Sequence, residues 1–524
     1  MKRLLLLLVA LMSSASQLAL GQSADTRVEL QPKTVPILMD GTEQIVLRFS
    51  LTTKNACELR NIVLSHDGTT DLGNIRRVSV QRHDKNGETR FSDYKSPIQR
   101  TTLHVGDLRL EAGTHRFSIQ YAIDPGAKLT NRLAADVIMM GFSDGTTWRN
   151  KKLSIRQLRL AHNIHKRGQA DCHTFRIPAI AKTNSGTLLA VYDMRYNSRK
   201  DLQEHIDIGL SRSTDGGQSW SKPRPIMDMG EYGGKPQKEN GCSDPGILVD
   251  ANTGEIFVSA CWTYGKPGTH QWQGKGSEPG YDINKSTQFM MIRSTDDGVT
   301  WTKPENLTRQ LKKESWWLFA PAPTVGITLR DGTLVMPTQA RDEKGHPFSN
   351  ITVSRDHGKT WTVSKPAQDD CSECTIAELS DGRIMINMRD NRNRKQKGDT
   401  NGRAVRVTGD LGQTWEVHSS DHKALPAPVC NASLLGHTLK DGRRILLFSN
   451  PRNKTRRATM TIQISFDEGK SWPAKNHVLL DELGGAYSGL VMVDDQTVGI
   501  LYESSAADMV FQKIPLSELN RSAE

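Results

Sequence analysis

Two cysteines have a spacing that metal sites and redox sites use. Cys371 and Cys374 enclose Ser372 and Glu373, and Cys-x-x-Cys pairs occur in zinc sites and in thiol–disulfide centres. The chain holds seven cysteines but no second pair of this kind, and no His-Glu-x-x-His sequence for a catalytic zinc. We therefore interpret the pair as small buried hydrophobic side chains on a strand, and we expect no metal or cofactor.

The formal net charge of +11 is consistent with an anionic partner. No compact basic tract with interleaved aromatic residues occurs, so the sequence does not favour nucleic acid. Scattered, solvated side chains account for most of the excess charge. Only a few arginines in strand-like segments support a specific site for an anion.

A repeated ten-residue pattern indicates the elements that position any such site. The five copies end at Trp220, Trp301, Trp361, Trp415 and Trp472. In each copy a Ser or Thr and an Asp can bond backbone N–H groups, Gly takes a positive φ, and Trp packs on adjoining strands. One shared carboxylate is too few for a calcium loop. The pattern therefore predicts a hairpin turn repeated through an all-β array.

Further strand-and-turn signals lie between the copies, such as "LSDGRIMINMR" and "LKDGRRILLFSN". The tryptophans are 81, 60, 54 and 57 residues apart, and units of this length fit four-stranded propeller blades. A β-helix is the alternative, but its repeats are much shorter. We predict an all-β fold with a six-bladed β-propeller over residues 156–524.

Residues 22–155 lack the repeat. Segments such as "TEQIVLRFSLTT" and "GTHRFSIQYAI" alternate polar and apolar residues, as half-buried strands do. We predict a smaller β-sandwich that precedes the propeller, a carbohydrate-binding-like accessory domain.

The first 21 residues have the organisation of a secretory signal peptide. Lys2 and Arg3 precede an apolar run over residues 4–12, and Ala-Leu-Gly ends at residue 21. A retained N-terminal anchor is the alternative. No other stretch is long and apolar enough to cross a bilayer. The sequence thus predicts a secreted or periplasmic protein whose mature chain does not insert into a membrane.

The segment Phe175-Arg176-Ile177-Pro178 precedes the first copy of the repeat. Together these motifs resemble the bacterial-type exo-α-sialidases (neuraminidases), which are six-bladed β-propellers. The resemblance extends from about Asn163 to the C-terminus. The combination of motifs is specific, although the repeat alone also occurs in unrelated propellers. It implies that the partners are sialylated glycoproteins, glycolipids and oligosaccharides. No pattern predicts an oligomeric state.

Sialidases of this kind hold the substrate carboxylate with three arginines. The resemblance assigns these roles to Arg176, to Arg389 in "MINMRD" and to Arg457 in "RRATMTIQIS". Guanidinium groups are always charged and bind carboxylates in a planar, bidentate manner, so a cluster of them selects an acidic sugar. Arg456 and Arg452 are alternatives to Arg457.

The same resemblance assigns the catalytic residues. Tyr487 in "GGAYSGL" matches the nucleophile, and Glu373 matches the carboxylate that activates it. A neutral phenol approaches an anomeric carbon that bears a carboxylate without the repulsion that Asp or Glu would meet. Asp201 is the predicted general acid/base, with Asp193 and Asp207 flanking it. Protonation of a leaving oxygen at neutral pH requires a raised pKa for Asp201.

Three further residues match supporting positions of the family. Arg195 and Asp244 resemble residues that line the pocket around the hydroxyls of the sugar ring. Glu503 resembles the carboxylate that orients Arg176.

The resulting hypothesis is a sialidase that releases terminal sialic acids with retention of configuration. Transfer to another sugar, or intramolecular transfer that yields an anhydro product, is the alternative within the same catalytic set. A glycan-binding propeller without catalysis is the alternative from another class, and it would be indicated by loss of Tyr487, Glu373 or Asp201. All three residues are present.

Overall fold

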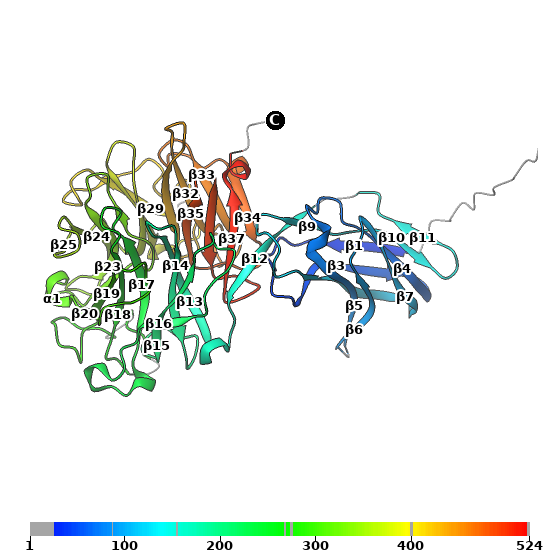
Figure 1. Cartoon of the computed structure of the whole chain (residues 1–524), viewed down its shortest axis with the longest axis horizontal. Coiled ribbons are helices and arrows are strands. Elements are labelled where there is room, and N and C mark those ends of the chain that lie inside the picture. Colours follow the sequence, from blue (N-terminus) through cyan, green and yellow to red (C-terminus); the bar gives the residue numbers. More distant parts are fainter. Residues whose placement is uncertain are drawn as a thin grey trace, which may run out of the picture.

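The computed structural model describes residues 26–85, 87–152, 156–266, 269–272, 276–398 and 402–520. The fold is almost entirely β, with a large body on one side and a smaller one, coloured blue, on the other (Figure 1). The predicted signal peptide and the domain boundary at residue 155 lie outside the described residues, so both stay predictions. Within the described part of the chain, no helix has the length and apolar character needed to cross a bilayer.

The smaller body is a sandwich of two antiparallel sheets, as its alternating strands predict. One sheet has the order β1 (Thr26–Gln31), β3 (Glu43–Thr53), β8 (Gly113–Ile123), β5 (Ile75–Asp84) and β6 (Gly87–Lys95). The other has the order β11 (Thr147–Arg149), β10 (Asp136–Phe142), β4 (Cys57–Ser65) and β7 (Arg100–Leu110). The inward-facing side chains of both sheets form one core that includes Leu51, Leu59, Ile62, Leu103 and Phe117.

The large body consists of six antiparallel sheets, which confirms the predicted six-bladed propeller. Blade 1 is β13 (Thr174–Lys182), β14 (Leu188–Arg195), β15 (Ile206–Ser213) and β16 (Arg224–Met227). Blade 2 is β17 (Cys242–Val249), β18 (Ile256–Trp262), β19 (Gln288–Ser294) and β20 (Glu305–Asn306). Blade 3 is β21 (Leu318–Pro321), β23 (Leu334–Arg341), β24 (Pro347–Ser354) and β25 (Thr362–Val363), with β22 (Ile327–Thr328) and β26 (Gln368–Asp369) paired beside them.

The remaining blades follow the same plan. Blade 4 is β27 (Cys371–Glu378), β28 (Ile384–Asp390), β29 (Ala404–Thr408) and β30 (Glu416–Val417). Blade 5 is β31 (Ser433–Thr438), β32 (Arg444–Pro451), β33 (Met460–Ser465) and β34 (His477–Asp481). Blade 6 is β35 (Ser488–Asp494), β36 (Thr497–Tyr502) and β37 (Met509–Pro515), completed by β12 (Gln157–His165). The one α-helix of the described residues is α1 (Thr308–Leu311).

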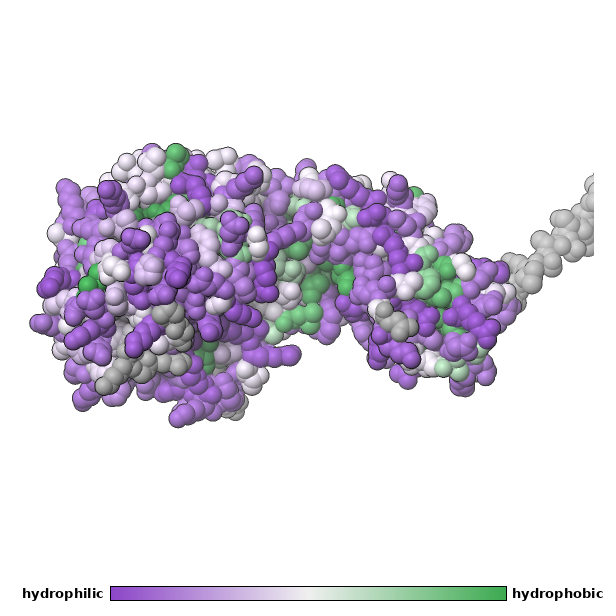
Figure 2. All heavy atoms as spheres, turned by 90° about the horizontal axis from the view of Figure 1, so that it is seen from below, coloured by the Kyte–Doolittle hydropathy of each residue, from purple (hydrophilic) through white to green (hydrophobic). Residues whose placement is uncertain are grey.

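The ring closes because β12, which precedes blade 1 in sequence, pairs with the C-terminal strand β37. The same β12 pairs with β2 (Ile37–Leu38) and β9 (Arg132–Ala134) from the sandwich side. One strand therefore joins both bodies. Apolar side chains gather at the waist between them, and further apolar groups lie on both bodies of this mostly hydrophilic face (Figure 2).

The repeated pattern forms the turn between the third and fourth strands of blades 1 to 5. In blade 2, Ser294 Oγ donates to Asp296 Oδ1 at 2.9 Å and accepts the N–H of Gly298 at 3.0 Å. Thr300 donates its N–H and its hydroxyl to the same carboxylate, at 2.8 Å and 2.6 Å. These hydrogen bonds lower the pKa of Asp296 to about 2. The pattern thus closes a turn, as predicted.

The turn also contacts the preceding blade, which the sequence pattern alone does not indicate. Gly217 has a φ of +85°, and a Cβ there would lie 2.2 Å from the ring of Phe511 in blade 6. Trp361 meets Phe257 of blade 2 edge to face, with ring centroids 5.8 Å apart. The repeat therefore stabilises the junctions between blades as well as each hairpin.

Cys371 and Cys374 are fully buried in β27 and pack in an apolar cluster, which confirms their interpretation as buried hydrophobic side chains.

An ion-pair cluster links the two bodies and gives a test of the junction. Arg132 of β9 and Arg159 of β12 both bind Glu518, which follows β37. Burial raises the pKa of Glu518, but Arg159 and Arg132 outweigh it, so the pKa lies below the ordinary value of 4.5. The stabilisation of the folded state by the Glu518 ion pairs is therefore complete above pH 4.5, and it is lost as the pH falls through the folded-state pKa of Glu518.

We expect Glu518→Gln to lower the free energy of unfolding at pH 7 by about 2 kcal/mol, measured by denaturant titration. This is less than a fully buried pair would give, because the Glu518 side chain is 24% exposed. The matched control is Asp441→Asn, which removes an exposed pair with Arg443 and should change stability by less than about 0.5 kcal/mol. Equal effects for the two variants would contradict a structural role for the cluster.

Candidate active site

A cavity of about 560 Å³ is lined by residues from all six blades. Because blades of a propeller meet only around its axis, the cavity lies on that axis. Seven of the nine residues singled out in the sequence line it: Arg176, Asp201, Asp244, Glu373, Arg389, Arg457 and Tyr487.

Backbone bulges aim three of these side chains. The inner strands β13, β17 and β27 each shift register, next to Arg176, Asp244 and Glu373 respectively. Two of the bulges contain residues in the left-handed region, with φ of +58° at Ile177 and +62° at Asp244. This conformation is costly for a β-branched residue such as isoleucine. Bulges of this kind redirect side chains beside active sites.

Carboxylates hold the two strained bulges in place. Glu503 accepts the N–H of Ile177 at 3.0 Å, and Asp193 accepts the N–H of Asp244 at 3.0 Å. Asp193 also accepts a hydrogen bond from the Ser243 hydroxyl at 2.6 Å. The bulged backbone thus obtains partners that a regular ladder would have supplied.

Tyr487 lies directly before β35, and its side chain is buried. Its hydroxyl donates to Glu373, and Arg389 Nη1 donates to the Tyr487 hydroxyl at 2.9 Å and also binds Glu373. Burial and the charge of Glu373 raise the pKa of Tyr487 well above its ordinary value. The phenol therefore stays protonated, with an acceptor already in contact and a cation beside its oxygen.

The three predicted arginines surround this phenol. The guanidinium carbons of Arg176 and Arg457 lie 5.8 Å and 5.5 Å from the centre of the Tyr487 ring. Arg389 contacts the hydroxyl from β28. Arg457 comes from the loop between β32 and β33, and its neighbours Arg452 and Arg456 do not line the cavity. The structure brings together the set that resemblance indicated and selects Arg457 within its loop.

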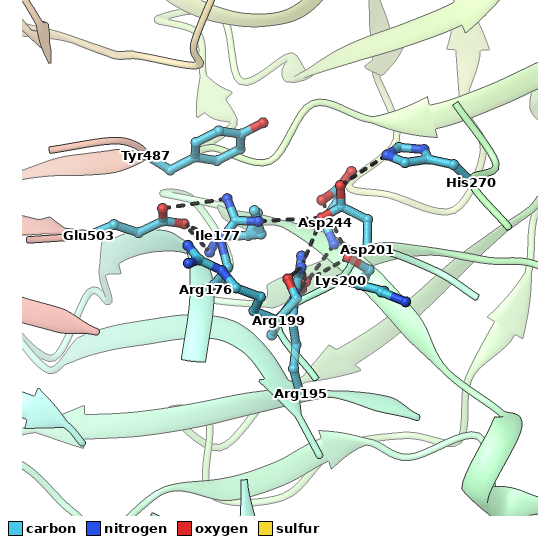
Figure 3. Close-up of polar contacts among 12 residues, drawn as sticks. Arg176, Ile177, Arg195, Arg199, Lys200, Asp201, Asp244, His270, Tyr487 and Glu503 are labelled. Carbon is cyan, nitrogen blue, oxygen red and sulfur yellow. Dashed lines mark hydrogen bonds and ion pairs between the residues drawn. The ribbon is translucent and has the colours of Figure 1, made fainter. Parts of the chain in front are cut away.

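Asp201 lies in the loop between β14 and β15. Its Oδ1 accepts from Arg195 at 2.8 Å and from Arg176 at 3.4 Å, and its Oδ2 lies 3.2 Å from His270 Nε2 (Figure 3). Burial alone would raise the pKa of Asp201, but the hydrogen bond from His270 and the two guanidinium groups outweigh it. The pKa is therefore lowered, whereas the sequence analysis expected a raised one.

The pKa values of the flanking candidates Asp193 and Asp207 are raised, and so is that of Asp244. Asp244 is buried, and the charges of Asp193, Glu373 and Asp201 add to the effect of burial. Asp244 lines the cavity, as predicted.

Arg195 differs from its prediction. It is fully buried and does not line the cavity, because Asp193 binds it through Nη2 at 2.7 Å and it donates to Asp201. It acts on the site through Asp201. The flanking candidate Asp207 lies on β15 and binds Tyr196 at 2.8 Å, outside the cavity lining.

Several lining residues were not predicted from the sequence, among them His270, Trp272 and Arg394. His270 and Trp272 lie in the long connection between β18 and β19. The sequence indicates this long connection by the spacing of 81 residues between the first two repeat tryptophans, because the other tryptophans are 54 to 60 residues apart. This excess marks an insertion in blade 2, although spacing gives no indication of where an insertion folds.

Comparisons with known proteins identify the family of the chain. Residues 186–500 match the BNR repeat-like domain. The chain is 38% identical to a sialidase of Bacteroides fragilis over 534 residues, which covers 95% of this chain and 96% of that one. It is 33% identical to a sialidase of Micromonospora viridifaciens over 352 residues, covering 64% and 50% of the two chains.

Solved structures are similar as well. The Hadza microbial sialidase Hz136 superposes with a TM-score of 0.86 at 34% identity, over 94% of this chain and 99% of that one. The intramolecular trans-sialidase of Ruminococcus gnavus superposes with a TM-score of 0.55 at 20% identity, over 69% and 98% of the two chains. The second likeness concerns the fold alone.

The contacts of Glu503 predict how the arginine cluster is held. Glu503 lies 3.3 Å from Arg176 Nε and also binds the Ile177 bulge. Glu503→Gln keeps the shape but removes the charge, so we expect about tenfold weaker binding of free N-acetylneuraminic acid by calorimetry, about 1.4 kcal/mol. Glu378→Gln, at the other end of β27 and paired with Arg330, is the control and should leave this binding unchanged. Equal affinities for wild type and Glu503→Gln would contradict the role of Glu503.

Proposed function

The chain belongs to the sialidases, a group of glycoside hydrolases, and we propose that it releases terminal sialic acids with retention of configuration through a covalent bond to Tyr487. The observation that carries the proposal is the contact of one buried phenol with Glu373 and Arg389, inside a cluster of three arginines. The substrates are sialylated glycoproteins, glycolipids and oligosaccharides.

The arginine cluster gives the site its preference for an acidic sugar. Arg176, Arg389 and Arg457 present fixed guanidinium groups around Tyr487, and a carboxylate can bind such groups in bidentate geometry. The carboxylate of a sialic acid is attached to its anomeric carbon. Binding it here therefore places that carbon beside the phenol oxygen.

Tyr487 forms the covalent bond. Its oxygen attacks the anomeric carbon while the phenolic proton passes to Glu373, which already accepts it in a hydrogen bond. The high pKa of Tyr487 makes proton loss unfavourable unless it is coupled to attack. Arg389 stabilises the negative charge that develops on the phenol oxygen.

Asp201 completes both halves of the reaction. In the first half the bond between the anomeric carbon and the glycosidic oxygen breaks, and the proton of Asp201 passes to that oxygen. In the second half Asp201 takes a proton from water, the water oxygen bonds to the anomeric carbon, and Tyr487 leaves with the proton held by Glu373.

Substrate binding supplies the protonated form of Asp201. In the free site, Arg176 contributes to the low pKa of Asp201. A substrate carboxylate that binds Arg176 neutralises this cation. This change raises the pKa of Asp201, so the acid forms where the leaving group arrives.

The test compares Tyr487→Phe with Tyr502→Phe. Tyr502 is a fully buried tyrosine on β36 whose hydroxyl binds Gln512. The same substitution there is therefore a matched control outside the site. We expect Tyr487→Phe to lower kcat for a 4-methylumbelliferyl α-sialoside by about a thousandfold or more, and Tyr502→Phe to retain most of the activity.

Proton NMR of the first product completes this test. Retention requires the α anomer of free sialic acid to appear before mutarotation. A β anomer appearing first, or full activity of Tyr487→Phe, would refute the tyrosine mechanism. An anhydro sugar as the product would replace hydrolysis by intramolecular transfer.

We also propose that residues 1–21 direct export to the periplasm or the medium, and that residues 22–155 form an accessory domain that binds carbohydrate. A cavity of about 380 Å³ in the sandwich supports the second proposal, because Trp148 lines it together with Lys152 and Arg156.

Binding to immobilised mucin tests the accessory domain in the full chain. With Tyr487→Phe to prevent turnover, we expect the added change Trp148→Ala to weaken mucin binding severalfold. Tyr94→Ala, on the exposed strand β6, is the control. Unchanged binding after Trp148→Ala would refute the site, and N-terminal sequencing of exported protein tests cleavage after residue 21.

A further inference from the structure

His270 contacts the general acid/base from a different blade. It comes from the connection between β18 and β19, and its Nε2 lies 3.2 Å from Asp201 Oδ2 (Figure 3). The side chain is 39% exposed, so it forms part of the cavity wall and is not buried in the core. The proposed reaction uses Asp201 in both of its halves, yet it leaves His270 without a role.

The contact is fixed from both sides. Gln203, two residues after Asp201, donates its backbone N–H to the carbonyl of Thr269 at 3.1 Å, directly before His270. On the other side, Trp272 packs against an apolar cluster that contains Leu202, Ile206, Cys261, Leu318 and Ala320. The segment that carries His270 and the loop that carries Asp201 are therefore joined as one unit.

The hydrogen bonds of the ring indicate which of its two nitrogens carries the proton of a neutral imidazole. The backbone N–H of Trp272 donates to His270 Nδ1 at 3.3 Å, so Nδ1 is an acceptor and carries no proton. The proton of a neutral imidazole then lies on Nε2, which faces Asp201. Protonation of Nδ1 would turn two N–H groups toward each other. The backbone thus favours the tautomer whose N–H is directed at the carboxylate.

The two oxygens of Asp201 have different surroundings. Oδ1 accepts from Arg195 and Arg176, whereas Oδ2 faces His270. Because a guanidinium keeps its protons, the proton that Asp201 transfers belongs on Oδ2. The other charged groups near the pair are Asp244 from β17, and Lys266, Glu278 and Lys285, which line a neighbouring cavity together with His270.

We propose that His270 is a positioning residue for the sialidase reaction, which as a neutral imidazole donates from Nε2 to Oδ2 of Asp201 and so orients the oxygen that exchanges the proton. This inference rests on the proposed role of Asp201. His270 does not transfer a proton itself, because its ring keeps the same tautomer through the cycle.

The hydrogen bond sets the balance between the two states of Asp201. An N–H donor binds a carboxylate more strongly than it binds a neutral carboxylic acid, so His270 favours the ionised form. Loss of the donor therefore raises the pKa of Asp201 in the enzyme–substrate complex. Proton donation then persists to higher pH, and the carboxylate needed to activate water forms only at higher pH.

Two variants separate this role from simple space filling. His270→Phe keeps a ring and loses the donor, whereas His270→Gln retains an N–H near the position of Nε2 and does not titrate. The pH dependence of kcat is measured with two substrates. The lactose of α2-3-sialyllactose is a poor leaving group that needs protonation by the acid. A 4-methylumbelliferyl α-sialoside has a good leaving group, so the second half of the reaction limits its rate.

We expect both limbs of the pH dependence of kcat to shift to higher pH in His270→Phe. The basic limb for sialyllactose and the acidic limb for the aryl sialoside should each move by about one pH unit, which corresponds to about 1.4 kcal/mol. His270→Gln should return both limbs to within about 0.3 units of the wild-type positions. Melting temperatures establish that the variants are folded, and His346→Phe, in a surface pair with Asp342, is the matched control.

Limbs that coincide in His270→Phe and wild type would overturn the inference, and so would a shift in His270→Gln as large as that in His270→Phe. Asp201→Ala distinguishes this failure from failure of the proposed function. If Asp201→Ala loses sialyllactose cleavage more than aryl sialoside cleavage, Asp201 is the acid and the result concerns His270 alone. If both substrates are cleaved as by the wild type, the assigned role of Asp201 itself is wrong.

Discussion

Three guanidinium groups lie around a single phenol, and such a cluster of like charges is unfavourable unless acids compensate it. Arg176 obtains Glu503 as a partner, and Arg389 obtains Glu373. In the described part of the chain, Arg457 has no acidic partner, and its guanidinium donates to the carbonyl of Val429 at 3.3 Å. Among the described residues, Arg457 is therefore the guanidinium of the cluster that no acid contacts, and in the proposed function the substrate carboxylate takes that place.

The acids that compensate the arginines also bind the backbone. Glu503 compensates Arg176 and also holds the N–H of the bulged residue Ile177. Asp193 likewise neutralises the buried Arg195 and holds the bulge at Asp244. The same carboxylates thus compensate the charges and fix the local conformations that aim the side chains. A substitution at either acid would disturb charge and geometry together, which makes a conservative amide replacement more informative than alanine.

The sequence predicts the parts of the structure that depend on neighbouring residues. The turn of blade 2 could be predicted because Ser294, Asp296 and Gly298 lie within five positions, and their hydrogen bonds are local. The contact between Arg389 and Tyr487 spans 98 positions, and only the family resemblance placed them together. Composition and periodicity carry no information about such pairs, because the ring of blades brings them into contact.

The errors have the same origin. Arg195 was predicted to face the sugar, but Asp193 lies two residues before it on the same strand and holds its guanidinium in the interior. The low pKa of Asp201 depends on His270, which belongs to an insertion in the next blade. Protonation states in this site are set by contacts between blades, and no single segment of the sequence contains them.

The ionised form of Asp201 in the free site suits the second half of the proposed reaction better than the first. Asp201 is held as a carboxylate by Arg195, Arg176 and His270, which is the form that takes a proton from water. Of these three donors, only Arg176 also belongs to the cluster that we propose to bind the substrate carboxylate. The acid form of Asp201 is therefore coupled to occupancy of the arginine cluster, while Arg195 and His270 keep the carboxylate in position throughout. In the proposed reaction, a ligand without a carboxylate would leave Arg176 bound to Asp201, so the site would select against neutral glycosides at the proton-transfer step as well as at binding.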